Sequence, residues 1–246
     1  MSDVLEILGQ TKNLAVEESV YRNICSLIVS EDLFDDIVED PSDIAMAQAI
    51  EEHAKPPHFS SRHPIVHRPF EEAEWNESVQ YPFENWQETR FSDGKFGVWY
   101  GASDLETTIH ETAYHWVKRT LVEEGQIPEG RYIERKIYTV QLDALVLDLR
   151  PLCKKYKKLI HPTDYSLTHQ VGRTIHEQGH PGLITNSASC KGDVYSVFNP
   201  KVLSDPKVNC WMRYSIRNNR IEISKADGSQ TTTIQLNRLR GTTFKF

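Results

Sequence analysis

The chain has 246 residues, of which 39% are hydrophobic, and this composition suits a globular protein with a substantial core and excludes a mostly disordered chain. Its 28 basic and 35 acidic residues give a formal net charge of −7, which disfavours broad binding to nucleic acid. No apolar run approaches the roughly 18 residues of a membrane span, so we expect no membrane partner. The four scattered cysteines form no CxxC pair, which is typical of reduced thiols, and we expect a cytoplasmic protein.

The N-terminal segment has a helical spacing of apolar residues. These residues recur at every fourth position over 16–28, and we therefore predict a helix within residues 14–40. A second helix is expected over 44–53, where two following prolines would end it. We predict that residues 1–58 form a helical extension.

Downstream, a stretch rich in proline and aromatic residues (56–90) reads as loop with short elements, and strands and helices then alternate. Asp104 is the expected N-cap of a helix over 105–123, and Gly179 marks the end of another over 165–178. An Asn218-Asn219 turn indicates a hairpin. Other alternating segments predict strands over 96–100, 132–142, 144–149, 182–185, 194–198 and the TTTIQL segment near 231. This order of elements predicts an α+β fold.

The motif His176-Glu177-Gln178-Gly179-His180 spells HExxH, the signature of a zinc peptidase. That chemistry needs both histidines on one face of a continuous helix. Here a glycine lies between them and Pro181 follows the second, and proline disfavours helical geometry at the residue before it. We therefore expect a chance match at a helix end and no metal, with the zinc peptidase kept as a remote alternative.

A second constellation consists of Arg90, Tyr100 and Glu111. An arginine after a loop, an aromatic residue at a strand end and a carboxylate on the following helix can converge on one site. Such a set suits a phosphorylated ribosyl ligand, because the guanidinium binds phosphate, the ring stacks, and the carboxylate binds a hydroxyl or a developing cation. The bland alternative is that these are ordinary surface and core residues.

The run ETRFSDGKFGVWYGASDLETTIHE resembles the RES domain family, which carries an arginine–aromatic pair, a glycine turn, a strand ending in tyrosine and a later glutamate. The segments YTVQLDALVLDLRP and HPGLITNSASCKGDVYSVFNP are similar to the family's paired strands and to its Gly-hydrophobic strand followed by serine. The resemblance covers residues 60–205 approximately, and implies a catalytic domain over 59–205. The turn signals beyond it predict a C-terminal β-hairpin extension over 206–246 packed on the core.

The resemblance implies an ADP-ribosyltransferase-like fold, with a mixed and antiparallel β core and flanking helices. It also implies a toxin of a bacterial toxin–antitoxin pair that cleaves NAD⁺ by hydrolysis or phosphorolysis. Carried over residue by residue, the catalytic residues would be Arg90, Tyr100, Glu111 and Ser187. Arg90, Phe91, Tyr100 and Ser187 would bind the NAD⁺.

Loss of nicotinamide from the cationic pyridinium of NAD⁺ passes through an oxocarbenium-like transition state, which the carboxylate of Glu111 would stabilise. His115, four residues later, falls on the same helix face. The alternatives are ADP-ribose transfer to a protein and a binding module with a degenerate site. The expected partners are NAD⁺ as substrate, a cognate antitoxin and a second copy of the chain, without any further cofactor.

Overall fold

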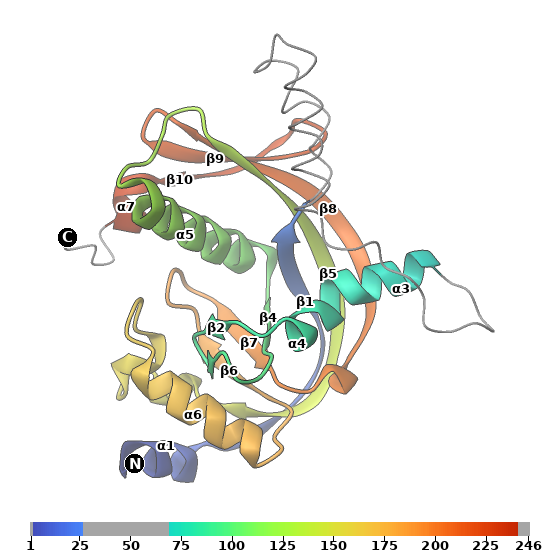
Figure 1. Ribbon diagram of the computed structural model, residues 1–246, viewed down its shortest axis with the longest axis vertical. Coiled ribbons are helices and arrows are strands. Elements are labelled where there is room, and N and C mark those ends of the chain that lie inside the picture. Colours follow the sequence, from blue (N-terminus) through green and yellow to red (C-terminus); the bar gives the residue numbers. More distant parts are fainter. Residues whose placement is uncertain (1, 27–68, 241–246) are drawn as a thin grey trace, which may run out of the picture.

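The computed structural model describes residues 2–26 and 69–240. Its centre is one strongly curved, eight-stranded mixed sheet (Figure 1). In spatial order the strands are β1 (Lys12–Cys25), β4 (Trp99–Ala102), β7 (Asp193–Val197), β6 (Gly182–Asn186), β5 (Tyr132–Asp148), β8 (Leu203–Arg217), β9 (Arg220–Lys225) and β10 (Gln230–Gln235). A separate small hairpin joins β2 (Glu88–Thr89) to β3 (Ser92–Asp93).

The sheet closes on itself because β1 pairs with both β4 and β5. The β1–β5 ladder is long and antiparallel, running from Lys12 opposite Asp148 to Cys25 opposite Arg135. Every other pairing in the sheet is also antiparallel except that of β5 with β6, which is parallel. The strands that form this closed ring are β1, β4, β7, β6 and β5. Buried side chains from all five pack into one cluster that includes Trp99. The predicted α+β class with a mixed β core is therefore confirmed.

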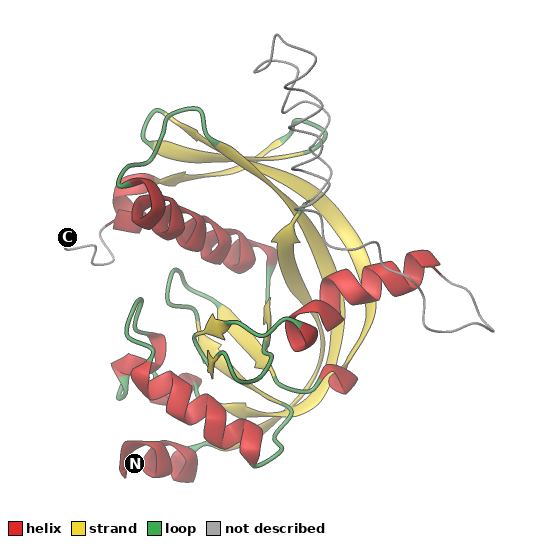
Figure 2. Ribbon diagram, viewed as in Figure 1, coloured by secondary structure: helices red, strands yellow, loops and turns green. Residues whose placement is uncertain are grey.

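Four helices gather on one side of the sheet, at the left of Figure 2: α1 (Ser2–Gln10), α5 (Leu105–Glu124), α6 (Ser166–Glu177) and α7 (Leu236–Arg240). On the opposite side, α3 (Pro69–Trp75) continues through a π-helical turn (Asn76–Gln80) into α4 (Tyr81–Glu84). Short 3₁₀ turns occur at Arg150–Leu152, Lys157–Ile160 and Pro200–Val202. None of these described helices combines the length and the apolar character that crossing a membrane requires.

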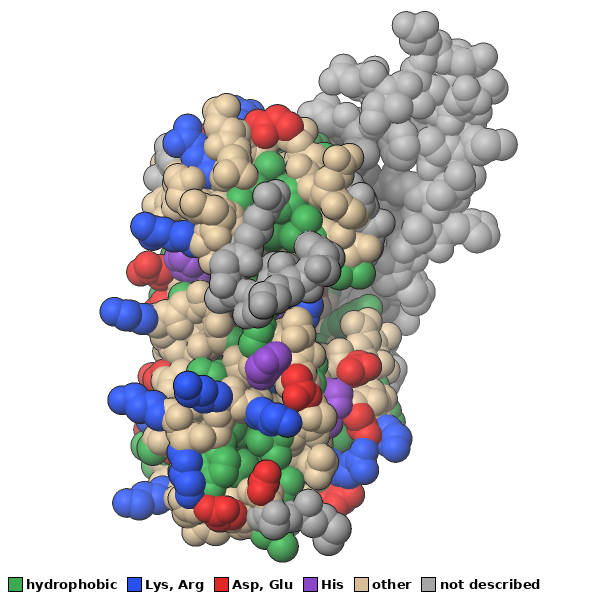
Figure 3. Space-filling model, turned by 90° about the vertical axis from the view of Figure 1, so that its left-hand side faces the viewer, with side chains coloured by type: hydrophobic (Ala, Val, Ile, Leu, Met, Phe, Trp, Pro, Cys, Tyr) green, Lys and Arg blue, Asp and Glu red, His purple; other side chains and the backbone are tan. Residues whose placement is uncertain are grey.

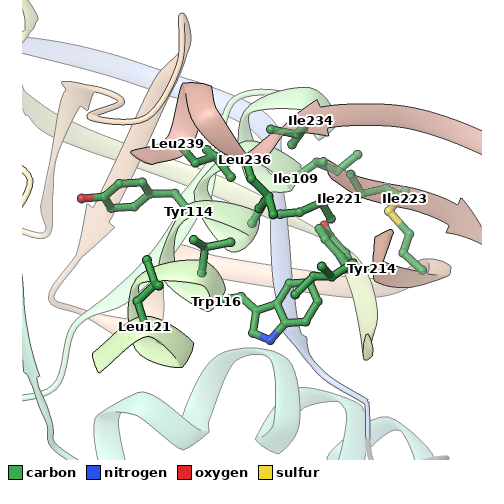
Figure 4. Packing of buried hydrophobic residues seen from close by; sticks show 14 of the residues in the cluster. Ile109, Tyr114, Trp116, Leu121, Tyr214, Ile221, Ile223, Ile234, Leu236 and Leu239 are labelled. Carbon is green, nitrogen blue, oxygen red and sulfur yellow. The ribbon is translucent and has the colours of Figure 1, made fainter. Parts of the chain in front are cut away.

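The helices on the first side are held by two apolar clusters. In one, α5 packs against β8, β9, β10 and α7, with Trp116, Ile221 and Leu239 among the buried side chains (Figure 4). In the other, α1 and α6 pack on the far end of the sheet through Ile7 and Ile175, which are both fully buried. Helices α5 and α6 therefore pack in different apolar clusters, and each is fixed by its own cluster. Loops lie between the two helices (Figure 1).

The predicted helix within residues 14–40 is wrong where the structure describes it, because residues 12–25 form β1. A spacing of four is also an even spacing, so the apolar residues that fit one helix face fit one strand face equally well. The polar Glu18 and Arg22 on that face hid the period of two. Glu18 accepts a hydrogen bond from the Tyr195 hydroxyl, and Arg22 donates one to the carbonyl of Tyr100 at 2.8 Å.

Most other predicted elements are confirmed with small shifts. Asp104 accepts a hydrogen bond from the amide of Thr107 at 2.7 Å and caps α5 as expected. The two strands predicted over 132–149 are one continuous strand, β5, and the strand predicted over 96–100 begins three residues later. Two helical parts were missed, α7 and the α3–α4 region, and the helix predicted over 44–53 lies outside the described residues. Both predicted extensions, 1–58 and 206–246, contribute strands to the common sheet.

Candidate active site between α5 and α6

The four residues predicted to be catalytic come from four separate elements. Arg90 lies in the β2–β3 turn, Tyr100 on β4, Glu111 on α5, and Ser187 directly after β6. Ser187 donates a hydrogen bond to Glu111, and the Tyr100 hydroxyl contacts the residues on both sides of Arg90. The ring of Tyr165 contacts both Arg90 and Lys118, which follows Glu111 on α5, and so links these two pairs. The structure therefore brings all four into one site.

Arg90 is held at the tip of the β2–β3 hairpin, where Thr89 pairs with Ser92 and leaves only two residues in the turn. Its Nη1 donates a hydrogen bond to the carbonyl of His161 at 2.6 Å. Its guanidinium lies 4.9 Å from the ring centroid of Tyr165, in cation–π geometry. Arg90 is thus fixed by neutral groups and retains its charge for an anionic ligand.

Tyr100 and Phe91 hold the turn that carries Arg90. The Tyr100 hydroxyl accepts a hydrogen bond from the amide of Phe91 and donates one to Oγ1 of Thr89, both at 3.0 Å. It therefore ties the residues on both sides of Arg90 to β4. The side chain of Phe91 is completely buried in the apolar core, so the prediction that it contacts a ligand directly is not supported by its position. We assign it a positioning role.

Glu111 is an ionised carboxylate in a mostly buried place, with 20% of its side chain exposed. Burial acts to raise its pKa, but hydrogen bonding and charge from His115, the hydrogen bond from Ser187 and the charge of Arg90 outweigh it. The net pKa of Glu111 is lowered to about 2. Nε2 of His115 lies 3.5 Å from Oε2 of Glu111, and His115 is half exposed. The site therefore presents a permanent negative charge at neutral pH.

Ser187 opens the tight loop between β6 and β7 and is fixed by that loop. Its Oγ accepts hydrogen bonds from the amides of Ser189 and Cys190 at 3.0 and 3.1 Å, which leaves its own proton for Glu111. Its amide donates to the carbonyl of Gly192 at 2.8 Å and closes the loop. A Cβ at Gly192 would overlap Oγ1 of Thr107, so only glycine lets the loop approach the first turn of α5.

An ion-pair network supports the base of this loop. Arg150 contacts Asp148 at 2.8 Å and Asp193 at 2.7 Å, and the side-chain amide of Asn186 donates a hydrogen bond to the carboxylate of Asp193 at 3.1 Å. Asn186 and Asp193 are the last residue of β6 and the first of β7. The network therefore sets the direction in which the chain leaves for Ser187.

The sequence analysis missed three side chains that line the same place: Tyr114, Lys118 and Tyr165. Tyr114 belongs to the apolar cluster against α5, its hydroxyl points away from the other labelled side chains (Figure 4), and burial raises its pKa to about 12. Lys118 donates to the carbonyl of Pro162 at 3.2 Å. Tyr114 and Lys118 follow Glu111 by three and seven residues, so the helical period could have found them, whereas nothing local marks Tyr165.

The HEQGH motif does not form a metal-binding face. Helix α6 ends at Glu177, so His180 lies beyond it, and Gly179 has a φ of 75°. The ring of His176 stacks on Phe96 at 4.3 Å between centroids. Among residues 2–26 and 69–240, no group of three or more His, Cys, Asp or Glu side chains could hold a metal ion.

The side of the molecule that carries α5 and α6 displays several Lys and Arg side chains with histidines among them (Figure 3). The family model of the RES domain matches residues 65–217, a span that includes all four predicted catalytic residues. No curated protein matches the chain. A chain of the crystal structure of the M. tuberculosis MbcT–MbcA toxin–antitoxin complex is similar at 14% identity, covering 84% of this chain and 91% of that chain, with a TM-score of 0.44.

Proposed function

This chain belongs to the RES domain family, and from that premise we propose that it cleaves the bond between nicotinamide and ribose in NAD⁺. Arg90 would bind the phosphates, Ser187 would anchor the ribose, and Glu111 would face the carbon at which the bond breaks. Tyr100 would hold Arg90 in place through the backbone and offer its ring to the ligand.

The observation that carries this proposal is the ionised state of Glu111. A carboxylate with a pKa of about 2 holds no proton at neutral pH and cannot serve as a general acid. Nicotinamide needs no acid, because it leaves a cationic pyridinium as a neutral molecule. What the reaction does need is a negative charge beside the developing oxocarbenium ion, and Glu111 supplies it.

In the proposed step, the C1′–N bond breaks and its electron pair goes to the nicotinamide nitrogen. Water or phosphate then attacks C1′, and attack by water releases a proton. Nε2 of His115 lies 3.5 Å from Oε2 of Glu111 and helps to keep that carboxylate ionised, so the proton goes to solvent. Transfer to a protein side chain would use the same site with a different acceptor.

The test is a time course of NAD⁺ with the full chain, with and without phosphate, following nicotinamide and the ribosyl product. We expect many turnovers per protein molecule, and a Glu111→Gln variant that folds normally and has lost at least 100-fold in rate. Glu106→Gln is the matched control, since Glu106 is on the same helix with 85% of its side chain exposed. Absence of NAD⁺ loss, or full activity in Glu111→Gln, contradicts the proposal.

Family membership also supports a role as the toxin of a toxin–antitoxin pair. We expect expression of the wild-type chain to stop growth and lower cellular NAD⁺, and expression of Glu111→Gln to do neither. Co-expression of a protein encoded beside it should restore growth if that protein is the antitoxin. Growth arrest by Glu111→Gln equal to that of the wild type would separate toxicity from the proposed reaction.

A further inference from the structure

Two cations meet at one aromatic ring beside the Glu111 site. The guanidinium of Arg90 lies 4.9 Å from the ring centroid of Tyr165, and Nζ of Lys118 lies 5.5 Å from the same centroid. The two cations come from separate elements, the β2–β3 turn and α5, and Tyr165 is the residue that precedes α6. The ring therefore marks a point where three parts of the fold converge.

Both cations are held by neutral oxygen atoms. Arg90 donates to the carbonyl of His161 and Lys118 to the carbonyl of Pro162, and within the described part of the chain no carboxylate lies within 4.0 Å of either cation. The turn that supplies these carbonyls is itself fixed, since Nδ1 of His161 accepts hydrogen bonds from the backbone amides of Thr163 and Asp164 at 3.2 and 2.8 Å. Carbonyl oxygens orient the cations without neutralising them.

Keeping two positive charges together in a partly buried place is unfavourable in the free protein. Burial lowers the pKa of Lys118, and the charge of Arg90 lowers it further. A ligand that brings two negative charges would remove this repulsion and gain a charge-assisted hydrogen bond from each cation. A dianion should therefore bind here more tightly than a neutral or singly charged ligand.

The position of Lys118 along α5 relates this pair to the reaction. Glu111 and Lys118 are seven residues apart, which puts them on one face of the helix and about 10 Å apart along its axis. A ribosyl group with its 5′-pyrophosphate is of comparable length. With the ribose at Glu111, the phosphates would reach the two cations.

We propose that Arg90, Lys118 and Tyr165 form a subsite for the pyrophosphate of a dinucleotide, and that Lys118 selects NAD⁺ over nicotinamide ribosides that lack a pyrophosphate. The inference rests on the proposed function for the identity of the substrate. It adds a residue of α5 to the binding role that Arg90 was expected to have, and it assigns Tyr165 the task of holding the two cations at a fixed separation.

The test uses the full chain and calorimetric binding of three probes: ADP, adenosine and inorganic phosphate. The variants are Lys118→Gln, which removes the charge, and Lys118→Arg, which keeps it. Lys158→Gln is the matched control, because Lys158 lies in the 3₁₀ turn Lys157–Ile160 before α6, has 62% of its side chain exposed and pairs with Asp164 at 3.5 Å. Thermal unfolding of each variant checks that it folds.

We expect Lys118→Gln to weaken ADP binding about tenfold, and Lys118→Arg and Lys158→Gln to change it less than threefold. Adenosine binding should not respond to Lys118→Gln. In turnover, Lys118→Gln should raise KM for NAD⁺ with little change in kcat, and should not alter cleavage of nicotinamide riboside.

Two results would overturn the inference. One is ADP binding by Lys118→Gln as tight as that of the wild type. The other is inorganic phosphate binding as tight as that of ADP, which would make the subsite one for a single phosphate. Because ADP binding requires no turnover, Lys118-dependent binding without any nicotinamide release would refute the proposed function and leave the dianion subsite standing.

Discussion

The hydroxyl of Ser187 donates a hydrogen bond to the carboxylate of Glu111, although the two residues are 76 positions apart in the chain. The contact exists because the β6–β7 loop reaches the start of α5, and it reaches α5 because Gly192 has no side chain to collide with Thr107. Gly192 thus allows Ser187 to lie beside the Glu111 carboxylate.

Replacing Gly192 tests this dependence. We expect Gly192→Ala to displace the loop, break the Ser187–Glu111 contact, lower the rate of NAD⁺ cleavage at least tenfold and cost about 1–3 kcal/mol of stability through overpacking. Gly9→Ala in α1 is the control, since a Cβ there meets nothing within 4 Å, and it should be neutral or slightly stabilising. Rates and unfolding free energies of both variants check the prediction, which fails if Gly192→Ala behaves like Gly9→Ala.

Stability should depend on pH through Glu111. Its pKa in the folded protein, about 2, is below the ordinary 4.5, so its ionised form contributes stability above pH 4.5 and this contribution is lost as the pH falls toward 2. The shift corresponds to about 3 kcal/mol at neutral pH. We expect Glu111→Gln to be less stable than the wild type at pH 6, and the difference to shrink toward pH 3. Urea unfolding across that range measures it, and a difference independent of pH would contradict it.

Substitution of Gly172 in helix α6 should also displace a neighbouring segment. A Cβ at Gly172 would overlap the carbonyl oxygen of Phe91, the residue that follows Arg90. Although alanine favours helix formation, we expect Gly172→Ala to push the β2–β3 turn away, destabilise the protein by about 1–3 kcal/mol and raise KM for NAD⁺. The exposed Gln170→Ala on the same helix is the control. Steady-state kinetics decide the matter, and an unchanged KM in a folded Gly172→Ala would refute the link between α6 and Arg90.

Substitution within the HEQGH motif should leave both the fold and the rate unchanged. Since the ring of His176 stacks on Phe96 and His180 lies beyond α6, His176→Phe should keep the stacking, the fold and the rate of NAD⁺ cleavage. Treatment with a metal chelator should likewise leave the rate unchanged. Metal content and rate measured on the same sample check both statements, and zinc near one equivalent that is lost in His176→Phe would show that the motif binds metal.

Structural features that depend on neighbouring residues could be predicted from the sequence. Asp104 caps α5 because its side chain reaches the amide three residues on, and the Asn218-Asn219 turn adopts positive φ values that suit a hairpin. The order of these elements was enough for the α+β class. The family resemblance, carried by short motifs, was enough to select Arg90, Glu111 and the other candidate residues.

Features that depend on contacts between distant segments could not be predicted in this way and are visible only in the folded chain. Val16 and Val20 fit a helix or a strand equally well, and pairing with β5 settled the question in favour of a strand. Tyr165 has no local signal, because its role comes from contacts with Arg90 of the β2–β3 turn and Lys118 of α5. The pKa of Glu111 depends on His115 of its own helix, but also on burial and on Ser187 and Arg90, which the packed chain brings from other elements.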